Sequence, residues 1–251
     1  MRFSLLHPSR RRLTLAARAI DEWREKASGQ HALEYLLSVD ADDPDLEGYR
    51  KLAENRDVRL LVGENRSIVD ATNRAARASS GDVLVVVSDD FGCPEAWDET
   101  IADLLGEDLD RAVWVADGID NALMTLPILG RRFYESLGYV YHPDYLSMYA
   151  DDELTEVARS RRKVIDARHV QFEHRHYSKL GTRADSTYRR QNSERAYLHG
   201  WRVFERHRAK GFSDEPKPAA WPRIARVEAL YWARRIAAGA GLSGRGERNP
   251  G

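Results

Sequence analysis

The chain has 251 residues, of which 42% are apolar and 31% are charged. This composition is typical of a folded, soluble globular protein and excludes a largely disordered chain. No stretch is long and apolar enough to predict a membrane span or a signal peptide. A single cysteine, Cys93, excludes an intramolecular disulfide and a thiolate metal cluster, so we expect a cytoplasmic protein with one main domain.

The net charge of −1 hides an asymmetry between two parts of the chain. Residues 1–150 contain 17 Lys and Arg against 27 Asp and Glu, whereas residues 151–251 contain 22 against 13. The acidic part suits a metal ion, and the basic part suits an anionic partner, either a diphosphate or a nucleic acid. Solvated charged faces are the simpler alternative.

Apolar strands alternate with amphipathic helices through the first half of the chain. Leu13, Ala16, Ile20 and Trp23 recur at helical spacing, and a second helix is predicted from Ser67, which caps it, to residue 78. The predicted strands are residues 3–6, 33–39, 58–62, 83–87 and 112–116. Such alternation predicts a Rossmann-like α/β fold, with a mostly parallel central sheet and helices on both faces.

The second half of the chain is less regular and more aromatic. It predicts a short helix at 154–161, short strands at 164–165 and 170–172, and a long charged helix at 185–208. Residues 211–222 are rich in proline and lysine and predict a linker. An amphipathic helix at 224–237 and a loose tail from Gly239 follow, which together form a helical C-terminal extension.

Polar residues follow each of the first four strands, where open parallel sheets bind their ligands. The strongest feature is Ser88-Asp89-Asp90, directly after the buried strand 83–87. Adjacent carboxylates repel each other unless a cation compensates them, and Mg²⁺ or Mn²⁺ bound there would share its remaining positions with substrate phosphates and water. Alternatively, both carboxylates only cap the turn that follows.

The order of motifs from Asn65 to Pro94 resembles family 2 inverting glycosyltransferases with the A-type fold. The matching segments are Asn65-Arg66-Ser67, Ala71-Thr72-Asn73, Ser80-Gly81-Asp82, the strand 83–87, Ser88-Asp89-Asp90 and Pro94. The family's leading aspartate is replaced by Val87 or Ser88, depending on the alignment, so the principal metal ligand is either Asp89 or Asp90.

The resemblance extends to Tyr149-Ala150-Asp151-Asp152-Glu153-Leu154, which looks like the family's later acidic motif. It implies that Asp151, or Asp152 in its place, is the general base that activates the acceptor hydroxyl. The competing interpretation is that these acidic side chains only stabilise the start of a helix.

The segment Phe172-Glu173-His174-Arg175-His176 resembles the strand-end histidine that supplies a further metal ligand in many A-type enzymes. It implies His174 first and His176 second as ligands, and imidazole favours Mn²⁺ over Mg²⁺. The alternative is a pair of surface histidines.

The resemblance also implies a set of residues that bind the nucleotide-sugar donor. Asp40 is suited to accept the imide N–H of uracil or thymine, which favours a UDP- or dTDP-sugar, and Arg66 is suited to the diphosphate. The full set is Pro8, Ser9, Arg11, Asp40, Asn65, Arg66, Asn73, Ser88 and Asp89.

We therefore expect a metal-dependent inverting glycosyltransferase whose acceptor is a saccharide or a modified nucleic-acid base. Its catalytic domain would span residues 1–210, with a donor-binding half at 1–117 and an acceptor-binding half at 118–210, followed by the extension at 211–251. A sugar-nucleotidyltransferase is one alternative, although the segment after the first strand, residues 7–12, lacks the expected glycines. A nucleic-acid-binding protein that uses the basic C-terminal part is the other.

Overall fold

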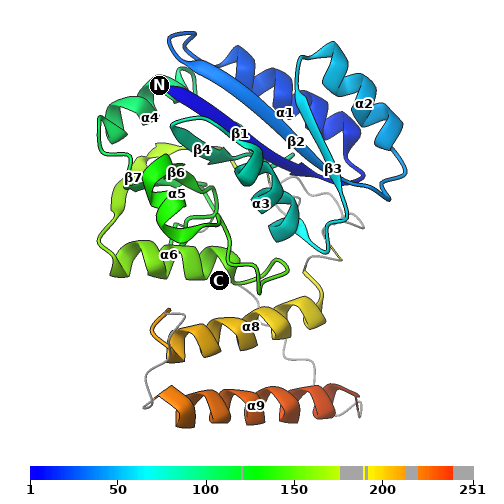
Figure 1. The fold of residues 1–251 in the computed structure, drawn as a ribbon, viewed down its shortest axis with the longest axis vertical. Coiled ribbons are helices and arrows are strands. Elements are labelled where there is room, and N and C mark those ends of the chain that lie inside the picture. The colour runs from blue at the N-terminus through cyan, green and yellow to red at the C-terminus, as the bar shows by residue number, and fades with distance from the viewer. Residues whose placement is uncertain (120, 176–188, 190–191, 213–219, 240–251) are drawn as a thin grey trace.

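The computed structural model of the chain describes residues 1–119, 121–175, 189, 192–212 and 220–239. These residues contain a seven-stranded sheet in the order β3-β2-β1-β4-β6-β5-β7, in which only β6 runs antiparallel to its neighbours (Figure 1). The strands are β1 (Arg2–Ser9), β2 (Ala32–Asp40), β3 (Arg59–Gly63), β4 (Val83–Val86), β5 (Ala112–Ala116), β6 (Ile128–Gly130) and β7 (Val164–Gln171). The predicted mostly parallel α/β sheet is confirmed.

Helices cover both faces of this sheet. They are α1 (Leu13–Glu25), α2 (Leu46–Asn55), α3 (Ile68–Ala78), α4 (Trp97–Leu105), α5 (Arg131–Leu137) and α6 (Ala150–Ser160). On β1, Leu5 belongs to the core cluster that includes residues of α1, α2 and α4, while Leu6 belongs to the cluster that includes residues of α3, α5 and α6. Successive side chains of a strand point to opposite faces, so the continuous apolar runs of the sequence serve two cores at once.

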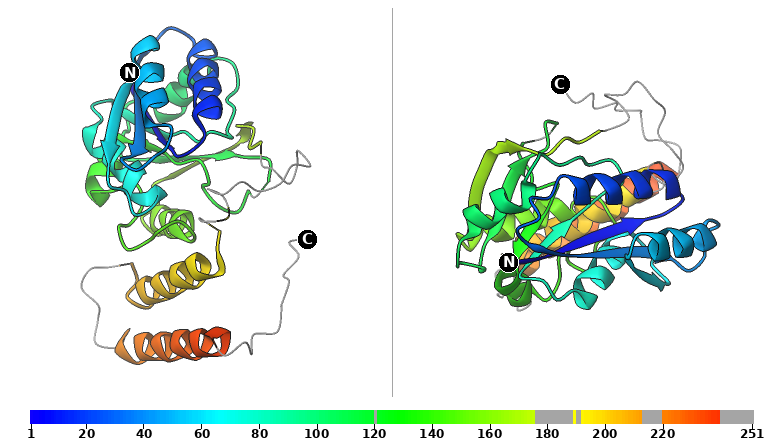
Figure 2. Two further views of the ribbon diagram at one scale, coloured as in Figure 1. Left: turned by 90° about the vertical axis from the view of Figure 1, so that its right-hand side faces the viewer. Right: turned by 90° about the horizontal axis from the view of Figure 1, so that it is seen from above.

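Two further helices form layers beyond α6. Helix α8 (Glu194–Ala209) packs against α6, and α9 (Trp221–Gly239) packs against α8, so that α6, α8 and α9 succeed one another away from the sheet (Figures 1 and 2). Val203 and Phe204 of α8 share a small core with Tyr145 and with Val69 of α3. The predicted helical C-terminal extension is confirmed. No helix among the described residues has the length and apolar character needed to cross a bilayer.

Several element boundaries differ from those predicted. Strand β6 was missed because its three residues follow Pro127 and give no alternating pattern. Strand β7 is one continuous strand, since its polar middle is held by backbone pairing with β5. Helix α6 begins at Ala150, so the acidic triplet occupies its first turn. Most of the predicted linker and tail, and much of residues 185–193, lie outside the described residues.

A half-buried carboxylate holds the turn that leads into β4. Glu34 of β2 accepts hydrogen bonds from the Ser4 hydroxyl, from the Ser80 hydroxyl and backbone N–H, and from the Gly81 backbone N–H. A Cβ at Gly81 would lie 2.7 Å from the Arg2 carbonyl oxygen, so only glycine allows this close approach. Burial alone would raise the pKa of Glu34, but these donors outweigh burial and lower it.

We expect Glu34→Ala to lower the free energy of unfolding by about 1–3 kcal/mol, because the buried Ser4 hydroxyl and Gly81 N–H lose an acceptor. The folded-state pKa is lowered, so the stabilisation is fully present above the unfolded pKa of about 4.3 and is lost as the pH falls below it. Urea denaturation at pH 7 and pH 4 measures both effects. Glu54→Ala, at an exposed position of α2, is the control and should change stability by less than about 0.5 kcal/mol.

Candidate active site

A cavity of about 360 Å³ lies at the carboxyl ends of β1, β2 and β4. It is closed on the other side by the start of α3, by residues around the start of α6 and by His174. Eight of the residues that the sequence predicts for the site line this cavity: Pro8, Ser9, Asp40, Ser88, Asp89, Asp90, Asp151 and His174. Segments that are far apart in the sequence therefore meet where the fold is expected to bind a ligand.

The two adjacent aspartates have different surroundings. Asp89 is almost fully buried, and its Oδ1 atom lies 2.9 Å from His7 Nε2 and accepts a 2.9 Å hydrogen bond from the Ser9 hydroxyl. Its Oδ2 atom lies 3.8 Å from the Arg12 guanidinium. His7 in turn contacts the Tyr35 hydroxyl at 2.8 Å. Asp89 is therefore held by groups of the protein itself, and it orders the loop after β4.

Asp90 is more open and faces His174. Its Oδ1 atom accepts a 2.5 Å hydrogen bond from the Ser88 hydroxyl, and its Oδ2 atom lies 3.7 Å from His174 Nε2. The other ring nitrogen of His174, Nδ1, lies 3.5 Å from Oδ2 of the buried Asp117. The imidazole thus lies between two carboxylates, one at the end of β4 and one at the end of β5.

Backbone pairing fixes this arrangement. The segment after β7 pairs antiparallel with the loop after β4: the Gly92 N–H donates to the Glu173 carbonyl, and the Arg175 N–H donates to the Asp90 carbonyl. The rings of Phe91 and His174 stack at 4.3 Å. Arg175 also makes a two-pronged ion pair with Glu22 of α1, at 2.6 and 2.7 Å. His174 therefore has little freedom to turn away from Asp90.

Asp90 and His174 stabilise each other's charged forms. Burial opposes the ionisation of Asp90, but the nearby His174 and the Ser88 hydroxyl outweigh it and lower the Asp90 pKa to about 2. Burial likewise disfavours the charged form of His174, but Asp117 and Asp90 outweigh it and raise the His174 pKa to about 9. Asp90 and Asp117 therefore both favour a positive charge at the imidazole between them. A proton on His174 supplies it in the free protein, and a bound cation would take the place of that proton.

Asp151 lines the cavity from the first turn of α6, whereas Asp152 does not. Burial and the neighbouring charge of Asp152 raise the pKa of Asp151 to about 7. The Thr155 hydroxyl donates to the Asp151 carbonyl and accepts from the Met124 N–H, which ties this turn to the loop before β6. A carboxylate with a pKa near neutrality, at the wall of a cavity, is suited to accept a proton.

Asp40 ends β2 at the far side of the cavity. Its Oδ2 atom accepts a 2.5 Å hydrogen bond from Arg10, and its Oδ1 atom accepts a 2.9 Å hydrogen bond from the Asn65 side chain. Asn65 is held in turn by Arg74, which donates to its Oδ1 atom at 3.1 Å. The carboxylate is therefore oriented from both sides, and each of its oxygens has a further lone pair.

Four predicted donor-binding residues do not line the cavity: Asn65, which holds Asp40 from outside it, and Arg11, Arg66 and Asn73. Arg10 and Arg12 line it in place of Arg11, whose backbone N–H donates to Asp43. Arg66 pairs with Asp70 on α3. Asn73 is buried and holds the backbone of residues 140 and 141, because its side-chain oxygen accepts both N–H groups and its NH₂ donates to a carbonyl. His176 lies outside the described residues.

The sequence interpretation missed Asp117 and His7. Asp117 directly follows the predicted strand 112–116, so its place at a strand end was the signal that could have revealed it. His7 was expected in the loop after the first strand, but β1 continues to Ser9 and buries it. Its role depends on the distant Tyr35 and Asp89, which no local pattern indicates.

No protein-family model matches the sequence, and no curated protein sequence matches it. Solved structures do resemble its fold. The mannosyltransferase PcManGT from Pyrobaculum calidifontis, solved with GDP-Man and Mn²⁺, is 19% identical over 96% of this chain and 76% of that one, with a TM-score of 0.57. Residues 1–349 of S. aureus TarS, solved with UDP-GlcNAc, are 13% identical over 95% of this chain and 83% of that one, with a TM-score of 0.54.

A longer TarS structure matches with a TM-score of 0.55 and 11% identity, and 95% of this chain spans half of that one. The chain has the glycosyltransferase A-type fold. In this fold, the cavity lies at the carboxyl ends of the strands, and it brings Asp90, His174 and Asp151 to one place. At these identities the likeness establishes the fold, and the roles of individual residues must be argued from their geometry.

The two aspartates should respond differently to substitution. We expect Asp89→Ala to lower the free energy of unfolding by about 1–3 kcal/mol, because His7 and Ser9 lose a buried acceptor. Asp90→Ala should change it by less than about 1 kcal/mol, since this side chain makes fewer and more exposed contacts. Chemical denaturation of both variants measures the difference. Equal losses would mean that both carboxylates serve the fold alike.

Proposed function

We propose that the protein is a metal-dependent inverting glycosyltransferase that moves a sugar from a nucleotide-diphosphate donor to an acceptor hydroxyl. The observation that carries this proposal is the cavity that joins the Asp90–His174 pair to Asp151. The solved structures with the same fold support it, because PcManGT was solved with GDP-Man and Mn²⁺ and TarS with UDP-GlcNAc.

Asp90 and His174 fit a divalent cation of the Mn²⁺ type. One carboxylate oxygen and one imidazole nitrogen face each other across 3.7 Å, a mixed set that Mn²⁺ accepts more readily than Mg²⁺. Asp117 would orient the ring through Nδ1, as carboxylates commonly orient metal-binding histidines. When bound, the cation would neutralise the negative charge on the departing diphosphate. Asp89, which is held by His7 and Ser9 of β1, would position the loop after β4 that carries Asp90.

Asp151 is our choice for the general base. An inverting displacement needs a carboxylate that takes the proton of the acceptor hydroxyl as this oxygen attacks the anomeric carbon, opposite the leaving diphosphate. Asp151 lines the cavity, and its raised pKa of about 7 gives it a useful proton affinity at neutral pH. Asp152 lies beside it, and its negative charge raises the pKa of Asp151.

Asp40 supports recognition of the base. A carboxylate accepts the imide N–H of uracil or thymine, whereas the corresponding ring nitrogens of cytosine and adenine are themselves acceptors and would be repelled. Guanine also offers N–H donors, so a GDP-sugar is the closest competitor. We favour a UDP- or dTDP-sugar, with Pro8, Ser9 and Arg12 beside the nucleotide.

The decisive experiment measures transfer and donor hydrolysis with UDP-, dTDP- and GDP-sugars, each with Mn²⁺, Mg²⁺ or a chelator. We expect activity with Mn²⁺ and loss with the chelator, and a fall of at least about 100-fold in Asp90→Ala, because charge stabilisation of the leaving group is lost. The exposed Asp103→Ala is the matched control and should keep full activity. Full wild-type activity in the chelator would reject the metal role.

For the base, we expect Asp151→Asn to bind the donor normally but to transfer sugar about 100-fold more slowly or worse. In the wild type, kcat/KM should rise with pH and level off above about 7, because only the deprotonated Asp151 accepts the proton. Asp152→Asn should stay active and move this rise to lower pH, because it removes the charge that raises the Asp151 pKa. If Asp152→Asn abolishes transfer and Asp151→Asn does not, the roles are reversed.

A further inference from the structure

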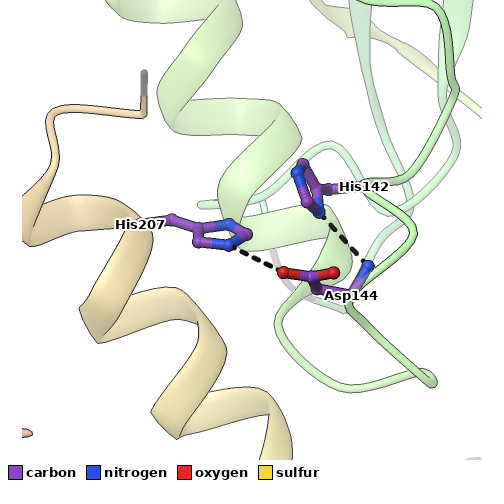
Figure 3. Close-up of side chains that lie close together, drawn as sticks. All are labelled: His142, Asp144 and His207. Carbon is purple, nitrogen blue, oxygen red and sulfur yellow. Dashed lines mark hydrogen bonds and ion pairs between the residues drawn. The ribbon is translucent and has the colours of Figure 1, made fainter. Parts of the chain in front are cut away.

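A second group of metal-binding side chains lies outside the cavity. His142 and Asp144 belong to the loop between α5 and α6, and His207 belongs to the last turns of α8. Figure 3 shows the three side chains converging from these two elements. One ligand atom from each lies within 4.8 Å of the other two. None of the three lines the candidate active site.

His207 is oriented as a metal-binding histidine would be. Its Nδ1 atom lies 2.7 Å from Oε2 of the buried Glu153, and the same oxygen accepts a 2.6 Å hydrogen bond from the Tyr145 hydroxyl. Because a carboxylate only accepts, it places the ring proton on Nδ1 and leaves Nε2 as the atom that faces outward. A carboxylate that fixes the tautomer in this way is the usual outer partner of a histidine ligand.

The outward atom of His207 meets a second carboxylate. Nε2 lies 3.2 Å from Oδ2 of Asp144. In neutral His207, a lone pair would point at a carboxylate oxygen, which is repulsive unless a positive charge lies between them. Ligand atoms about 2.0–2.2 Å from a tetrahedral ion are separated by about 3.3–3.6 Å, close to the observed distance. Asp144 is 62% exposed, so water can complete the coordination of an ion there.

His142 supplies the third ligand. Its ring lies 4.4 Å from the His207 ring at an angle of 66°. Its Nδ1 accepts the Asp144 backbone N–H at 3.2 Å, and a bound ion would take the imidazole lone pair in place of this hydrogen bond. Two protonated imidazoles this close would repel each other, whereas one cation shared by both would not. Two imidazoles and one carboxylate, with a fourth position open to water, form a ligand set typical of Zn²⁺.

We propose that His142, Asp144 and His207 bind Zn²⁺ and that this ion joins α8 to the loop preceding α6. This contact between α8 and the loop lies close to the start of α6, which carries Asp151. Further interactions hold α8 against the same loop. His199 of α8 contacts the Asp144 carbonyl at 2.9 Å, and a Cβ at Gly200 would lie only 2.2 Å from the Met148 carbonyl oxygen. The ion therefore stabilises an interface that the backbone already forms.

The test uses the full chain, first stripped with a chelator and then titrated with Zn²⁺. Calorimetry should show saturable binding of one ion at this site, and thermal unfolding should show a rise in Tm on adding Zn²⁺. Loss of even an outer partner of a zinc site weakens binding by about 10- to 100-fold, so His142→Ala and Asp144→Asn should each weaken it by about 100-fold or more. Asp144 is exposed and His142 is only half-buried, so these variants should fold.

Two controls separate this site from its competitors. The exposed His169→Ala should bind Zn²⁺ as the wild type does, and Asp90→Ala, which removes a ligand of the proposed catalytic metal, should still bind the ion held by His142, Asp144 and His207. If His142→Ala and Asp144→Asn bind Zn²⁺ as tightly as the wild type, or if only Asp90→Ala loses binding, the proposal is overturned. It is also overturned if the stripped protein binds no Zn²⁺, in which case a protonated His207 simply pairs with Glu153 and Asp144.

Discussion

The candidate active site depends on the antiparallel pairing of residues 173–175 with residues 90–92. These segments follow different strands, and the pairing places His174 between Asp90 and Asp117. Without it, Asp90 would be one carboxylate at the end of a strand. With it, the imidazole is held at a fixed distance by two backbone hydrogen bonds, a ring stack and the ion pair of Arg175 with Glu22. The geometry of the site is thus set by the backbone before any ligand binds.

The carboxylates of Glu34, Asp89 and Asp90 are compensated in different ways. Glu34 and Asp89 each accept several hydrogen bonds from nearby protein groups, so their negative charges are compensated within the fold. Asp90 and Asp117 share a single imidazole. The imidazole between them can carry a proton, or its nitrogen that faces Asp90 can bind a metal ion in place of that proton. On this ground we propose Asp90 rather than Asp89 as the metal ligand.

The sequence predicted the sheet because its strands are continuous apolar runs, and it predicted several residues that line the cavity because parallel strands end at a common edge. Pro8, Ser9, Asp40, Asp90 and Asp151 were placed at the cavity by this rule and by the family resemblance. The prediction failed for Asn73, where the position of the side chain depends on residues far away in the chain. The side chain of Asn73 is turned into the core by the backbone of residues 140 and 141, which no periodic pattern of the sequence indicates. Arg66 was misplaced for a local reason, because it pairs at the surface with Asp70, four residues along the chain.

Some of the opposite charges of the two parts of the chain form ion pairs with each other. The sequence suggested an external anionic partner for the basic part, but cations of this part pair with acidic residues of the first part: Arg175 with Glu22 and Lys163 with Asp110. On α8, Arg202 pairs with Glu228 of α9. Such pairs fix how segments meet more than they add to stability. Part of the charge asymmetry is therefore explained by ion pairs between the first and the second part of the chain.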